Sequence, residues 1–173
     1  MANAMNFEAL RIDRTRASLH IWLNRPESRN AMTLKMVAEL RQVLADAEAT
    51  RGTPDAVRVV VLRGAGGHFC AGADLKDMAA ARMRAMQATA GAPDPIAEVN
   101  ASFGELCVAY ARTPLAVVAV LEGTVMGGGF GLACVADVAI ASETASFRLP
   151  ETSLGVVPAH WRAVRLRHCL VDA

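Results

Sequence analysis

The sequence predicts an α/β domain with a largely parallel sheet, and two observations carry this prediction. Two apolar runs rich in β-branched residues, VRVVVL at 57–62 and LAVVAVL at 115–121, have the pattern of strands that are buried on both faces. Segments with helical spacing lie before, between and after these runs, and strands that alternate with helices in this way form parallel sheets. A shorter apolar run at 138–141 predicts a third such strand.

The chain opens with a predicted hairpin, which is followed by a helix. Residues 7–13 and 17–24 alternate well enough for strands, and the polar residues 14–16 separate them. Apolar residues then recur at helical spacing over 36–47, and Thr33 stands where an N-cap belongs. A Gly-Thr-Pro-Asp turn ends this helix.

Three further helices are predicted. Two of them, at 75–86 and 96–110, lie between the buried strands, and a stretch rich in glycine, alanine and proline separates them. The third, at 130–136, follows a glycine-rich turn. No internal repeat is visible.

Composition narrows the class of protein. The chain has 173 residues, 53% hydrophobic and 20% charged, which excludes disorder throughout and suits one domain. A net charge of +1 gives no excess of positive charge that would indicate binding to nucleic acid or to an anionic membrane. Four separated cysteines without a CxxC motif argue against zinc knuckles, thioredoxin chemistry and a disulfide scaffold. With neither a signal peptide nor a long apolar run, we expect a cytoplasmic protein without a membrane span, and its arginine- and alanine-rich composition indicates a bacterial source.

Two glycine-rich turns follow the buried strands, at 63–76 and 122–131. Neither contains the Lys-Ser/Thr ending of a Walker loop, the complete dinucleotide-binding fingerprint or the G-x-S-x-G of a serine hydrolase. Glycines allow a ligand to approach the backbone closely, and two N–H groups from separate turns can together hold one developing oxyanion. The alternative is that these glycines only permit tight packing of helices against strands.

Three motifs resemble the crotonase (enoyl-CoA hydratase/isomerase) superfamily. They are NRPESRNAM at 24–32, HFCAGADLKDM at 68–78 and EGTVMGGGFGLACVADVAIASETASFRLPETSLGVVP at 122–158, in the family's order and spacing over residues 7–158. The resemblance implies a spiral of ββα units that binds an acyl-CoA thioester in a bent pose. It implies no metal and no cofactor, because coenzyme A is part of the substrate.

The resemblance also assigns roles to individual residues. The two oxyanion-hole N–H donors correspond to Ala73 and Gly128. The remaining contacts to coenzyme A and substrate correspond to Arg29, Ala71, Gly72, Asp74, Leu75, Gly127 and Gly131, with the loop near Arg29 closing over the coenzyme. His68 could reach a phosphate of coenzyme A, or it could be an exposed loop histidine.

Glu151 is the candidate acid and base. Hydratases of this family commonly use two glutamates, and Glu151 corresponds to one of them. It follows a proline in an apolar run, where partial burial would suit proton transfer. The alternative is a surface glutamate that caps a helix beginning near Ser153.

The other glutamate position holds Gly131, so the sequence departs there from the two-glutamate pattern. The single-glutamate branch that it most resembles contains 3-methylglutaconyl-CoA and isohexenylglutaconyl-CoA hydratases of leucine and acyclic-terpene degradation. The resemblance therefore implies a lyase that adds water to a 2,3-unsaturated, 3-branched acyl-CoA. An enoyl-CoA isomerase remains open, since many isomerases keep the same single glutamate.

The match ends near Pro158, and we divide the chain into a core at 1–158 and an atypical tail at 159–173. Family members continue through helices that complete the acyl pocket and join subunits of a trimer or hexamer. The tail holds three Arg and two His and does not resemble that continuation, so we expect a C-terminal helical region that is missing or altered by truncation or a frameshift. The alternatives are an amphipathic terminal helix and a non-catalytic remnant that binds coenzyme A. The acyl-CoA substrate and further copies of the chain are the expected partners.

Overall fold

The computed structural model describes residues 7–89 and 91–150, and it confirms the α/β class. Its main sheet has five strands in the order β1-β2-β3-β4-β6. The strands are Leu10–Thr15, Ser18–Leu23, Val59–Gly64, Ala116–Leu121 and Val138–Ala141. β1 and β2 form the predicted antiparallel hairpin, and the remaining pairs are parallel, as the two buried apolar runs predict.

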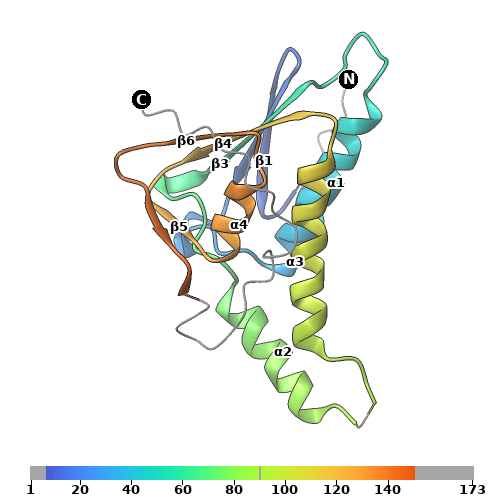
Figure 1. Cartoon of the computed structure of the whole chain (residues 1–173), viewed down its shortest axis with the longest axis vertical. Helices are drawn as coiled ribbons and strands as arrows, with labels where there is room; N and C mark the ends of the chain where they lie inside the picture. Colours follow the sequence, from blue (N-terminus) through green and yellow to red (C-terminus); the bar gives the residue numbers. More distant parts are fainter. Residues whose placement is uncertain (1–6, 90, 151–173) are drawn as a thin grey trace.

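Helices lie beside this sheet and extend beyond it. α1 (Leu34–Ala49) and α3 (Pro95–Arg112) run next to each other, whereas α2 (Leu75–Gln87) projects away from the sheet at the bottom of Figure 1. The predicted Thr33 cap is present, since its side chain accepts the N–H of Met36. In the described part of the chain, no helix is long and apolar enough to cross a membrane.

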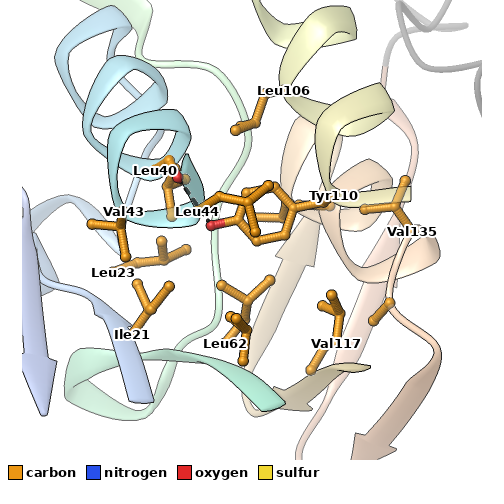
Figure 2. Packing of buried hydrophobic residues seen from close by; sticks show 14 of the residues in the cluster. Ile21, Leu23, Leu40, Val43, Leu44, Leu62, Leu106, Tyr110, Val117 and Val135 are labelled. Carbon is orange, nitrogen blue, oxygen red and sulfur yellow. Dashed lines mark hydrogen bonds between the residues drawn. The ribbon is translucent and has the colours of Figure 1, made fainter. Parts of the chain in front are cut away.

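The core forms between one face of the sheet and the two helices α1 and α3. Ile21, Leu62 and Val117 point from the strands toward Leu40 and Tyr110 (Figure 2). The Tyr110 hydroxyl donates to the Leu40 carbonyl over 3.2 Å, which joins α3 to α1 inside the core. This packing fixes the strand ends from which the two glycine turns leave.

One boundary expected from the sequence is wrong, and one small sheet was not predicted. β1 begins at Leu10 rather than at residue 7, because the N–H groups of Glu8 and Ala9 donate to the buried carboxylate of Glu39 instead of to a strand. A second sheet of two parallel strands, β5 (Thr124–Met126) and β7 (Ser146–Arg148), was not predicted, because three residues are too few to show a period.

The opposite face of the main sheet carries charged and aromatic side chains at one end and exposed apolar side chains at the other. Arg11 lies 4.3 Å above the ring of Trp22, and His20 stacks on the same ring. At the other end of the sheet, Val138 and Ile140 of β6 are each 38% exposed. The proposed division of the chain at residue 158 lies outside the described residues.

Candidate active site

The two glycine turns lie side by side although they are far apart in the sequence. The N–H of Phe69 donates to the Glu122 carbonyl over 2.8 Å, and the N–H of Cys70 donates to the Thr124 carbonyl over 3.0 Å. The N–H of Met126 returns a bond of 2.9 Å to the Cys70 carbonyl. These three bonds form a short parallel ladder that joins the end of the first turn to β5.

Glycines allow the two turns to touch beyond this ladder. Gly72 has φ of +91°, and a Cβ placed on it would lie 3.1 Å from the Met126 carbonyl oxygen. A Cβ on Gly129 would lie 2.6 Å from both the Cβ and the carbonyl oxygen of Cys70. The backbones of the two turns are therefore in direct contact next to Ala73 and Gly128.

The amides of Ala73 and Gly128 remain available at this contact. Within residues 7–89 and 91–150, no acceptor takes either N–H, whereas the neighbouring N–H of Asp74 donates to Met32 and that of Gly127 donates to Arg148. Gly128 is also the first residue of α4 (Gly128–Cys134), where backbone N–H groups lack helical partners. Two free donors on adjacent segments are what an oxyanion site requires.

Other predicted residues surround these amides. Ala71 and Gly72 precede Ala73 on the first turn, and the side chain of Leu75, which begins α2, is 84% exposed. Gly127 and the buried Gly131 belong to the second turn and α4. From α3, the Phe103 ring lies 3.3 Å from the point where a Cβ of Gly128 would stand, so this ring forms a wall beside one donor.

The carboxylate of Asp74 is engaged within the protein. It accepts a hydrogen bond of 2.8 Å from the Arg25 guanidinium and caps α2 by accepting the N–H of Lys76. Burial alone would raise the pKa of Asp74, but the bonds from Arg25 and Lys76 outweigh burial and lower the pKa. The backbone of Asp74 is engaged as well, since its N–H donates to Met32 and its carbonyl accepts the Met78 N–H.

The early loop is attached to the first turn through Asn30, which the motif analysis did not single out. Its side chain is fully buried, accepts the Arg25 N–H, and donates to the carbonyls of Ala65 and His68. The sequence offered only a partial signal: an asparagine in a polar loop favours the left-handed backbone that Asn30 adopts, but this does not show which groups its side chain binds. The predicted contact residue Arg29 has an exposed side chain, and its carbonyl accepts the Ala71 N–H.

His68 is not the exposed loop histidine that was one expectation, and its contact to a coenzyme A phosphate remains a prediction. Its ring is half-buried, and its Nδ1 accepts the N–H of Thr124 over 3.1 Å. Glu151 lies outside the described residues, so its predicted place beside the two amides remains a prediction. Among the residues that the structure describes, no cluster of His, Cys, Asp or Glu could hold a metal ion.

Comparison with known proteins relates the chain to one family of acyl-CoA enzymes. The profile of the enoyl-CoA hydratase/isomerase family matches residues 14–170. The 1,2-epoxyphenylacetyl-CoA isomerase of Escherichia coli is 35% identical over 79% of this chain and 48% of its own length. The mevalonyl-coenzyme A hydratase SIDH of Beauveria bassiana is 39% identical over 80% of this chain and 48% of its own length.

Two solved structures agree with the described fold. An enoyl-CoA hydratase/isomerase from Marinobacter aquaeolei is 48% identical with a TM-score of 0.78, and Pseudomonas aeruginosa AtuE is 52% identical with the same TM-score. Each comparison covers 88% of this chain and 55% of the other chain. The chain therefore spans about half the length of these relatives.

Proposed function

The chain belongs to the enoyl-CoA hydratase/isomerase family, and on this basis we propose that it acts on a 2,3-unsaturated acyl-CoA. The observation that carries the proposal is the pair of free amides, Ala73 and Gly128, on two turns in backbone contact. Attack on a thioester-conjugated double bond places negative charge on one oxygen. Two fixed N–H donors stabilise that enolate, and removing one such donor typically costs about 10²–10³ in rate.

Proton transfer is assigned to Glu151. In the leading reaction, hydration, this carboxylate would help water to add at C3 and deliver a proton to C2. Glu151→Gln should lower kcat by roughly 10² or more and leave the affinity for coenzyme A nearly unchanged, because the amide retains the shape without the acid. The exposed Glu143 provides a matched control, and Glu143→Gln should retain full activity. Equal activity in both variants would reject the role.

The substrate is proposed to be branched at C3 and of the glutaconyl type. What supports this is the glycine at 131, where two-glutamate hydratases carry a second carboxylate; Gly131 is buried in α4, three residues after the Gly128 donor. A panel of straight-chain enoyl-CoA and 3-methylglutaconyl-CoA thioesters, followed by mass, tests the assignment. Gly131→Glu should shift the preference toward straight-chain substrates because it fills space near C3.

The same panel separates the candidate reactions. Hydration adds the mass of one water, whereas isomerisation leaves the mass unchanged. The isomerase alternative is favoured by the E. coli relative, whose name states an isomerase. Binding of coenzyme A without turnover would indicate the non-catalytic alternative instead.

Contacts to coenzyme A are proposed for the first turn and the early loop. Ala71, Gly72 and Leu75 offer backbone groups or exposed apolar surface there, and Arg29 offers an exposed cation suited to a phosphate. We also assign the protein to the cytoplasm and to a homotrimer or hexamer. The exposed apolar side chains of β6 support assembly.

A further inference from the structure

The N–H of Thr124 donates to a side chain, although its position in the ladder would normally pair it with a backbone carbonyl. Cys70 and Val125 form a parallel bridge, and a regular continuation would send the Thr124 N–H to the carbonyl of His68. That carbonyl instead accepts a 2.7 Å bond from the Asn30 side chain. The imidazole of His68 takes its place and accepts the Thr124 N–H through Nδ1.

The space for this ring is provided by the opposite segment. A Cβ on Gly123 would lie 2.5 Å from Nδ1 of His68 and 2.3 Å from the Gly67 carbonyl oxygen. His68 and Gly123 are thus complementary, and only a glycine there lets the ring approach the backbone of residue 124. Because Nδ1 accepts a hydrogen bond from the Thr124 N–H, it carries no proton, and the proton of the ring is on Nε2.

We propose that His68 is a positioning residue for the amide donors at Ala73 and Gly128. This proposal rests on the proposed function, in which those donors bind the thioester oxygen. The bond from Thr124 to His68 stands at the start of the ladder, and the ladder leads directly to the contact between Gly72 and Gly127. Loss of the imidazole leaves a partly buried N–H without an acceptor and lets the two turns separate.

Two substitutions of His68 distinguish the effect of losing the hydrogen-bond acceptor from the effect of losing side-chain volume. His68→Ala removes the acceptor, whereas His68→Asn keeps an oxygen near the place of Nδ1. His20→Asn is the control, because His20 stacks on Trp22 in the main sheet, away from the ladder. With 3-methylglutaconyl-CoA, His68→Ala should lower kcat about 10- to 100-fold with little change in KM, and His68→Asn should recover most of that loss.

Nuclear magnetic resonance provides readouts that do not depend on turnover. In the unaltered chain, ¹⁵N shifts of His68 should show a bare Nδ1 and a protonated Nε2. The amide signals of Ala73 and Gly128 should move in His68→Ala and stay in place in His68→Asn and His20→Asn. If the unaltered chain turns over no thioester, the proposed function fails, yet these signals still decide the role of His68.

Three results would overturn the positioning role. They are a proton on Nδ1, unmoved amide signals in a folded His68→Ala variant, and a His68→Asn variant as defective as His68→Ala. If His68→Ala does not fold, the tautomer in the unaltered chain and the behaviour of His68→Asn still give a decision.

Discussion

At the scale of single residues, the contact between the two turns depends on the missing side chain of Gly72. Gly72 and Gly91 have almost the same φ, +91° and +90°, but a Cβ on Gly91 would meet nothing within 4 Å. Gly72→Ala should therefore lower the free energy of unfolding by about 1–3 kcal/mol more than Gly91→Ala, since the Met126 carbonyl must give way. Chemical denaturation of both variants measures the difference, and equal losses would show that only φ matters.

Some of the residue roles could be predicted from the sequence, and others required the structure. The close approach of the two turns was predictable, because both are rich in glycine. The choice of Ala73 and Gly128 as donors came from the family resemblance and remains a prediction. The roles of Glu39, Asn30 and His68 were not, because each side chain replaces a backbone partner that only the folded chain brings near. Nothing in the periodic pattern shows that Glu39 is buried whereas Glu48, on the same helix, is only half-buried.

At the scale of elements, Asp74 joins α2 to the early loop. The pKa of Asp74 is lowered in the folded chain by its bonds with Arg25 and Lys76. Its stabilising effect is therefore present at neutral pH and is lost as the pH falls through the folded-state pKa. Asp74→Asn should lower the free energy of unfolding by about 1.5–3 kcal/mol at pH 7, because it removes a charged partner from Arg25. This difference from the unaltered chain should shrink in acid.

A matched control exists on the next helix. Asp94 caps α3 by accepting the Ile96 N–H, without an arginine partner among its described contacts. Asparagine caps helices nearly as well as aspartate, so Asp94→Asn should change stability little at any pH. Denaturation curves at several pH values compare the two variants, and a loss at Asp94 as large as that at Asp74 would assign the effect to capping alone.

The long elements and the four-residue strand β6 were predicted, whereas the three-residue strands β5 and β7 were not. α1, α2, α3, β3 and β4 each span enough residues to show a period or an apolar run. β5 and β7 consist of three residues each, and they exist because the glycine turn and the segment after β6 meet in space. The parallel pairing of the main sheet followed from the apolar runs, but its strand order required the coordinates.

At the scale of the whole molecule, β6 is the edge strand of the main sheet among the described residues, and it presents an apolar surface. Val138 and Ile140 are exposed there, and an uncharged edge strand pairs readily with other chains. Light scattering of the 173-residue chain should show a mass that rises with concentration. Replacing both residues by lysine should reduce that mass toward the monomer.

Exposed methionines on α2 provide the control for this surface. Met83 and Met86 are 62% and 82% exposed, but they lie on the helix that projects from the sheet (Figure 1). Lysine at both positions should leave the mass unchanged. A monomeric unaltered chain, or an equal effect of both pairs of substitutions, would contradict assembly through β6.

The ladder between the two turns also governs when the site can form during biosynthesis. The bond from Thr124 to His68 joins residues 56 apart, whereas two residues connect β1 to β2. Closing a long loop costs more chain entropy than closing a hairpin, and contacts distant in sequence form late in folding. A nascent chain can pair its first two strands soon after they leave the ribosome. It gains both amide donors only after the whole α2–α3 segment and the start of α4 have been made.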